Sequence, residues 1–71
     1  MNEELVIGGI YRHFKGNLYR VISLATHSET EEIMVVYAKE YDDHSIWVRP
    51  LSMFLDYKDV QGEKVKRFTK V

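Results

Sequence analysis

The stretch Gly9-Ile10-Tyr11-Arg12-His13-Phe14-Lys15-Gly16-Asn17-Leu18-Tyr19-Arg20-Val21 decides the fold of this chain. It contains the run Ile10–Phe14 and the start of the run Leu18–Ala25, both rich in aromatic and β-branched residues, which favour strands. The pair Gly16-Asn17 lies between them and is typical of tight hairpin turns, because both residues tolerate positive φ. The sequence therefore predicts a β-hairpin.

Side chains alternate along a strand, so the two faces of the first strand differ in chemistry. One face carries Tyr11, His13 and Lys15, and the other carries Ile10, Arg12 and Phe14. The sequence does not show which of the two faces the core.

The run Ile33-Met34-Val35-Val36-Tyr37-Ala38 fits two structures. The residues from Ser28 to Glu31 match a capping box, and a helix from Glu31 to Tyr41 would gather apolar side chains on one face. The β-branched content, and the turn-like segment Tyr41-Asp42-Asp43-His44-Ser45 that follows, favour a strand instead. We predict a strand that pairs with both of its neighbours.

The segment after that turn predicts a strand followed by one helical turn. Ile46–Arg49 forms the strand, which Pro50 ends or confines to a sheet edge, because proline donates no hydrogen bond to a ladder. Pro50–Phe54 forms the helical turn, with proline at the first position. We expect the apolar side chains of this region to close one end of the fold: Leu51, Phe54 and Leu55.

The last part of the chain predicts a turn at Gln61-Gly62 and a final strand from Val65 to Thr69. Hairpin connections and short strands together predict an all-β fold in a single domain, residues 1–71. The expected architecture is a small SH3-like barrel of about five antiparallel strands, with one short helical turn before the last strand. A barrel of the oligonucleotide-binding type is less favoured, because it needs longer strands.

Composition restricts the class of protein. The chain has 71 residues, a net charge of −1 and no cysteine, which excludes disulfides and thiolate zinc sites. Its start, Met1-Asn2-Glu3-Glu4, is acidic, unlike a signal peptide. The longest apolar run, Ile33–Ala38, is far shorter than the ~20 residues of a membrane-spanning helix. We expect a soluble cytoplasmic protein that does not contact membranes.

Five groups of residues follow one another in an unusual order and spacing. They are the Gly9–Val21 stretch, Ala25-Thr26-His27-Ser28-Glu29-Thr30, Val35-Val36-Tyr37 with Tyr41, and Trp47-Val48-Arg49-Pro50-Leu51-Ser52-Met53-Phe54, with Arg67-Phe68 near the end. This pattern resembles the small bacterial family known as domain of unknown function 1653. The resemblance covers nearly the whole chain. It implies a stand-alone bacterial domain of about this size and no established activity, cofactor or partner.

The segment His27-Ser28-Glu29 offers the three residue types of a hydrolytic triad. In an extended segment His27 and Ser28 point in opposite directions, and the chain has no strained nucleophile turn of the Gly-x-Ser-x-Gly type. We therefore predict a bend between two strands, in which Ser28, Glu29 and Thr30 satisfy free backbone amides. The prediction is a protein without catalytic residues, and a small enzyme is the less favoured alternative.

The chain has three histidines: His13, His27 and His44. None lies at the close spacing of known metal-ligand pairs, so we predict no metal and no cofactor. His13 and His27 are better candidates for a hydrogen-bonded pair or a binding pocket. His44 is most simply a solvated loop residue.

Clustered Tyr, Trp, His and Arg residues predict a binding or adaptor domain. The leading hypothesis is interaction with an unknown protein or peptide, or self-association into a homo-oligomer. Nucleic acid or a small anion is the alternative, although the net charge of −1 disfavours a strong hold on phosphates. The expected surface joins the first hairpin, the bend at residues 27–31 and the strand of residues 46–49. The candidate ligand-binding residues are Tyr11, His13, Lys15, His27, Ser28, Glu29, Tyr37, Trp47 and Arg49.

The arginines allow two interpretations, which the sequence leaves open. They can gather around one anionic group, using bidentate hydrogen bonds, or they can pair with acidic residues of the bend across the sheet. The arginines concerned are Arg12, Arg20, Arg49 and Arg67, and the acidic residues are Glu29, Glu31 and Glu32.

Overall fold

The computed structural model describes residues 5–71, so the acidic segment Met1-Asn2-Glu3-Glu4, on which the signal-peptide expectation rests, lies outside the described residues. Strands and one short helix follow in this order: β1 (Ile10–His13), β2 (Leu18–Thr26), β3 (Ile33–Lys39), β4 (Ile46–Pro50), α1 (Leu51–Phe54), β5 (Tyr57–Val60), β6 (Glu63–Lys66) and β7 (Phe68–Lys70). The all-β prediction is confirmed.

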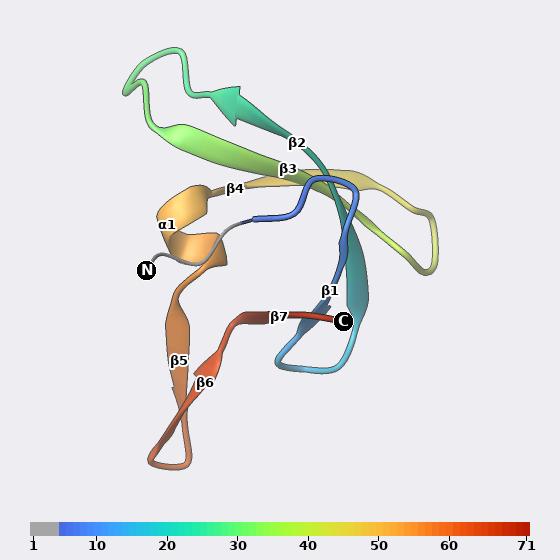
Figure 1. Ribbon diagram of the computed structural model, residues 1–71, viewed down its shortest axis with the longest axis vertical. Coiled ribbons are helices and arrows are strands. Elements are labelled where there is room, and N and C mark those ends of the chain that lie inside the picture. Colours follow the sequence, from blue (N-terminus) through green and yellow to red (C-terminus); the bar gives the residue numbers. More distant parts are fainter. Residues whose placement is uncertain (1–4) are drawn as a thin grey trace.

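The main sheet has five antiparallel strands in the order β4-β3-β2-β1-β7, and β5 and β6 form a separate hairpin (Figure 1). Strand β2 pairs with β1 through its first residues and with β3 along most of its length. The register between β2 and β3 shifts between Val21 and Ser23, which marks a β-bulge. Bulges bend a strand, and here the bend lets β2 pair with both β1 and β3.

The predicted hairpin, strand and helical turn are confirmed in the first three quarters of the chain. Ile33–Lys39 is a strand and not a helix, and it pairs with both neighbours. Helix α1 directly follows β4, and Pro50 caps it with φ −56° and ψ 140°. Proline therefore lies one position before the first helical residue.

The last part of the chain differs from the prediction. Gln61 and Gly62 have φ values of 52° and 85°, which suits a two-residue hairpin turn, so an unpredicted strand, β5, precedes the turn. The predicted strand Val65–Thr69 is two strands, interrupted at Arg67. The Arg67 N–H donates to the Asp56 carbonyl at 3.0 Å, and the guanidinium binds the Asp56 carboxylate through Nε at 2.6 Å and Nη2 at 3.0 Å. This contact returns the chain to the main sheet.

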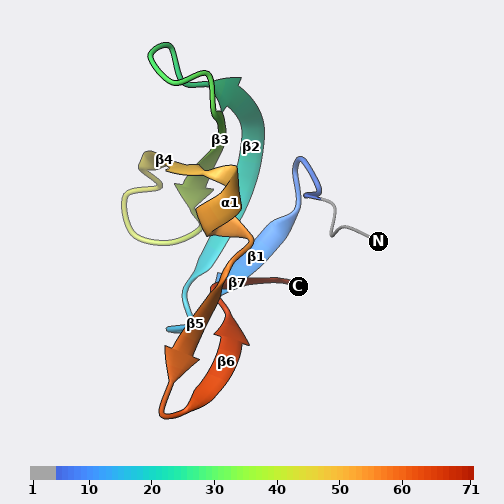
Figure 2. The same ribbon diagram turned by 90° about the vertical axis from the view of Figure 1, so that its left-hand side faces the viewer.

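The core lies on one face of the main sheet, called here the inner face. Tyr11 is 4% exposed, so the face of β1 that carries Tyr11 and His13 is the inner one. Helix α1 lies against this face (Figure 2). It contributes Phe54, whose ring stacks on Phe68 at 4.0 Å between centroids. Leu51 and Leu55 pack against the cluster, as expected from the sequence.

Candidate functional site

Part of the inner face remains open beside α1 and forms a groove of about 330 Å³. We call it the aromatic–basic groove; its lining residues are Tyr19, Tyr37, Lys39, Trp47 and Arg49. The strand register explains why they meet. Tyr19 lies opposite Lys39 and Tyr37 opposite Trp47, and Arg49 follows Trp47 by two residues on the same face.

The ring contacts of the core continue into the groove. The Tyr37 ring meets Phe68 at 5.7 Å and Tyr19 at 5.4 Å, both edge to face. Trp47 lies at the outer end and is 51% exposed, with its indole N–H donating to Ser45 Oγ at 2.8 Å. The groove is therefore built on rigid core rings and ends in a ring that is half accessible.

Arg49 is the half-buried cation of the groove. Its Nε donates a long hydrogen bond of 3.4 Å to the Tyr37 hydroxyl, and its guanidinium lies 5.9 Å from the Phe68 ring centroid. Among residues 5–71, no carboxylate lies within ion-pair distance of Arg49. A half-buried guanidinium without an acidic partner leaves donors available to an anion.

Lys39 is the second cation. Its ammonium lies 5.4 Å from the Tyr41 ring and 5.8 Å from the Trp47 ring. It also reaches Asp42 and Asp43 at 3.8 Å, but these carboxylates are 71% and 64% exposed, so both ion pairs are weak. The Lys39 ammonium can therefore still attract an anion in the groove.

Tyr19 contributes a hydroxyl that stays protonated. Burial, together with a 2.9 Å hydrogen bond to the Tyr41 hydroxyl, raises the pKa of Tyr19 to about 12. At neutral pH Tyr19 is therefore a hydrogen-bond partner and not a base.

His13 lies on the inner face next to the groove. Its ring packs on Phe14 at 4.5 Å and on Phe68 at 5.0 Å. Burial, and then the charges of Arg49, Arg67 and Lys15, lower the pKa of His13 below its usual 6.5. Burial thus disfavours the charged imidazole most, and the three neighbouring cations add to this effect.

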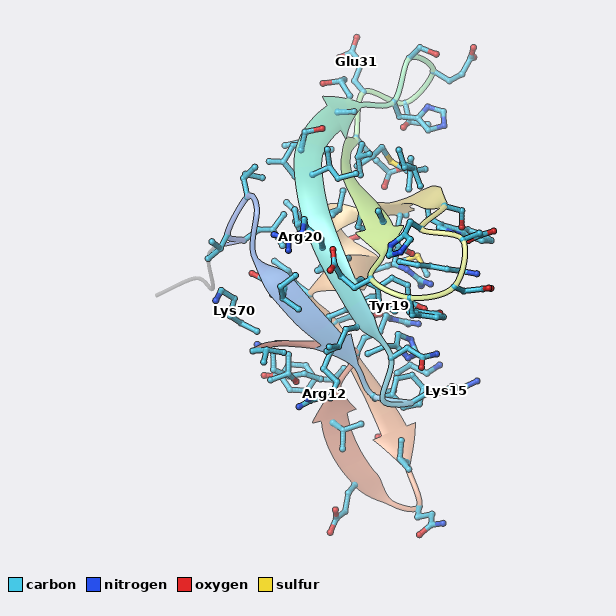
Figure 3. All side chains as sticks on the ribbon, turned by 90° about the vertical axis from the view of Figure 1, so that its right-hand side faces the viewer. Arg12, Lys15, Tyr19, Arg20, Glu31 and Lys70 are labelled. Atoms are coloured by element: carbon cyan, nitrogen blue, oxygen red, sulfur yellow. The ribbon has the colours of Figure 1, made fainter. Side chains whose placement is uncertain are left out.

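The bend at residues 27–31 lies at the opposite end of β2 and β3. Tyr19 and Thr26 are roughly 20 Å apart, because a strand rises about 3.3 Å per residue. Figure 3 shows Glu31 at the top of the molecule, well apart from Tyr19 near its middle. The predicted single surface is therefore divided, and His13 and His27 do not form a pair.

The bend itself is confirmed, with a different side chain at its centre. His27 Nδ1 accepts the backbone N–H groups of Glu29 at 3.1 Å and Thr30 at 3.3 Å. Glu31 has a φ of 63°, and the Glu32 N–H donates to Thr30 Oγ1 at 3.3 Å. Polar side chains here serve the local backbone, and Ser28 and Glu29 are exposed.

The remaining candidates fall into different environments. Tyr37, Trp47 and Arg49 line the groove, whereas Tyr11 is buried and its hydroxyl accepts the Val6 N–H at 3.0 Å. Lys15 is exposed in the β1–β2 turn, 6.0 Å from the Phe14 ring. The candidate set omits Lys39 and Tyr19, which the register of β2 and β3 would have identified.

Neither interpretation of the arginines is correct. The Nε of Arg20 binds Glu40 at 2.8 Å, and Arg67 binds Asp56. Arg12 is exposed on the outer face of β1, on the side opposite to Tyr11. The four arginines do not converge, and their partners among residues 5–71 do not include the acidic residues of the bend.

Residues 5–71 lack the features of two other kinds of site. They contain no group of three or more His, Cys, Asp or Glu side chains placed to hold a metal ion. None of the helices in this part of the chain is long and apolar enough to cross a membrane.

Comparison with known proteins identifies the family. Residues 9–70 match the family described as "Protein of unknown function (DUF1653)". The fold is similar to the crystal structure of a DUF1653 protein from Bordetella bronchiseptica, with a TM-score of 0.80 and 33% identity over 90% of this chain and 85% of that chain. The curated proteins include no match. The chain belongs to the DUF1653 family, as the resemblance of its motifs implies.

Proposed function

We propose that this DUF1653 protein is a binding domain without chemistry of its own, and that its aromatic–basic groove holds an extended protein segment through one acidic side chain. One observation carries the proposal. The groove presents the cations of Lys39 and Arg49 between aromatic rings, and no carboxylate is among its lining residues.

Arg49 supports an acidic ligand most directly. Its guanidinium is held in place by Tyr37 and Phe68 while its remaining donors have no carboxylate partner within the described chain. A carboxylate accepts two parallel hydrogen bonds from a guanidinium, and such charge-assisted bonds are about twice as strong as neutral ones. Trp47 and Tyr19 would pack against the apolar part of the same segment.

Single-stranded nucleic acid is the second candidate, because the accessible Trp47 ring would stack on a base. Two features favour a single carboxylate over a chain of phosphates. The net charge is −1, and Asp42 and Asp43 lie beside Lys39 at the mouth of the groove. A phosphate backbone would run into this acidic loop, whereas one side chain would not.

The architecture fits this role. A small bent antiparallel sheet with an aromatic groove is the arrangement by which SH3-like barrels bind extended segments, and we extend that analogy to this chain. The absence of cysteine from the sequence supports a cytoplasmic location as part of the same proposal.

The test is a titration of nitrogen-labelled protein with the peptide acetyl-Thr-Val-Glu-Val-Thr-amide. The control peptide carries glutamine in place of glutamate. We expect the glutamate peptide to shift the Trp47 indole and Arg49 Nε–H signals, and the control peptide to bind roughly tenfold more weakly or worse.

Two variants locate the site. Arg49→Gln removes the charge that faces the groove and should abolish the preference for glutamate, whereas Glu29→Gln, in the distant bend, should preserve it. Equal binding of both peptides, or shifts confined to the bend, would contradict the proposal. Oligo-uridine that shifts the same signals in a strongly salt-dependent way, with no response to the peptide, would favour the second candidate.

A further inference from the structure

The two edges of the main sheet differ in protection. At the β7 edge the strand has three residues and carries the exposed polar side chains Thr69 and Lys70. At the β4 edge three consecutive large apolar residues are accessible: Ile46 is 64% exposed, Trp47 51% and Val48 58%. Proteins protect edges with short strands and lysine, so the β4 edge is the one left open to another strand.

The backbone of β4 shows which groups face that opening. The Lys39 N–H donates to the Ser45 carbonyl, which places Lys39 and Ser45 at a hydrogen-bonding position of the β3–β4 ladder. Bonded and non-bonded pairs alternate in an antiparallel ladder, so the backbone of Trp47 also faces β3. The N–H and C=O groups of Ile46 and Val48 therefore point away from the sheet.

Pro50 agrees with this assignment. It lies opposite Met34 in the ladder, at a position whose backbone nitrogen faces the open edge. Proline is accepted in an edge strand where its missing N–H would have faced solvent. It also confines the free hydrogen-bonding groups of the edge to the segment before it.

This segment is self-complementary. A second β4 strand, antiparallel and related by a twofold axis at Trp47, places Ile46 opposite Val48 in both directions. All four outward N–H and C=O groups of each copy then find partners, and the two Trp47 rings form a non-hydrogen-bonded pair, the closer kind. Arg49 falls opposite Ser45 of the second copy and not opposite another cation.

We infer that the occupant of the β4 edge is a second copy of this chain, paired through Ile46–Val48 in a twofold dimer that joins the two main sheets. A closed twofold pair satisfies the open β4 edges of both copies at once. A strand from a different protein would satisfy only the β4 edge of this chain. The pairing stands independently of the proposed ligand. It places the two aromatic–basic grooves side by side across the Trp47 pair.

The first test is sedimentation of the whole chain at about 10 µM and about 1 mM, a range that brackets weak association. We expect a concentration-dependent shift from the 8.4 kDa monomer to twice that mass. Val48→Lys should abolish the shift, and Ile7→Lys, at a residue that is 52% exposed outside the sheet, should preserve it. A single monomeric species at both concentrations would overturn the inference.

A second variant separates pairing from folding. Val48→Pro removes only an outward N–H, so the β3–β4 ladder should survive while the dimer is lost. The register is read by mixing differently labelled copies, with expected contacts between Ile46 of one copy and Val48 of the other. A dimer that persists in folded Val48→Pro, or that lacks these contacts, would refute the β4 pairing.

Discussion

The inner face of the main sheet has two parts that share the same strands and differ in what covers them. Under α1, Val35, Phe54 and Phe68 are fully or almost fully buried, and no buried side-chain polar atom of the described residues lacks a hydrogen bond. Beside α1, the same strands present Lys39, Trp47 and Arg49 in an open groove.

The difference follows from the length of the helix. One turn of four residues covers only part of a five-stranded sheet, and the alternation of the strands continues beyond it. Positions that would hold core residues under a longer helix hold aromatic and basic ones here. The binding surface is thus a continuation of the core face, built on the same rings.

The largest expected effect comes from a substitution in the covered part of the inner face. Phe54→Ala removes the ring that stacks on Phe68 and should lower the free energy of unfolding by about 3–5 kcal/mol. Small domains have little more than that in total, so the variant should be largely unfolded at moderate urea concentrations. Urea denaturation followed by circular dichroism measures the change.

Met53→Ala is the matched control, because Met53 lies in the same helix and is 42% exposed. We expect it to cost below about 1 kcal/mol. Equal losses for the two variants would mean that the ring stack does not hold the cover in place.

The covered part was largely predictable from the sequence. Strand periodicity, the Gly16 turn and Pro50 predict the hairpin, β4 and α1, because these features act through local backbone preferences. The turn at Gln61-Gly62 was predicted, but strand β5 was missed because Tyr57–Val60 is only four residues long and contains Lys58 and Asp59, residue types that are depleted in strands. The break at Arg67 depends on its contact with Asp56, which no local pattern reveals.

The open part was predictable only in fragments. Tyr37, Trp47 and Arg49 were identified from residue type, while Lys39 required the register between β2 and β3. The bend around His27 was also predicted to belong to the binding surface, because its residue types suggest function. In the structure its polar groups satisfy local amides, whereas Arg49 has no acidic partner among residues 5–71. What distinguishes the bend from the groove is whether its polar groups already have partners, and not residue type.

A smaller effect on stability tests the open part. Trp47→Ala removes a half-exposed ring and should lower the free energy of unfolding by about 1 kcal/mol or less. The same change should remove the binding of the glutamate peptide, while Trp47→Phe should retain part of it. A loss of stability as large as that of Phe54→Ala would make Trp47 a core residue and remove the distinction between the two parts.

The smallest effect is a titration at the boundary, where His13 lies between the covered and open parts. Because burial and neighbouring cations lower its pKa, the folded protein binds this proton less readily than the unfolded chain. The sign follows: His13 costs no stability above pH 6.5, and stability falls as the pH drops from 6.5 through the lowered pKa. Proton NMR of the imidazole measures this pKa directly.

Arg49 makes the titration informative about the groove, since its charge is the largest cause of the lowered pKa after burial. Arg49→Gln should raise the pKa of His13 without restoring it fully, because burial remains. Glutamate peptide bound to wild-type protein should raise the same pKa, by neutralising Arg49, and should have no such effect in the variant. If neither change moved the His13 titration, burial and the charges of Arg67 and Lys15 would set its pKa without Arg49, and Arg49 would not supply the positive potential that recruits an acidic side chain to the groove.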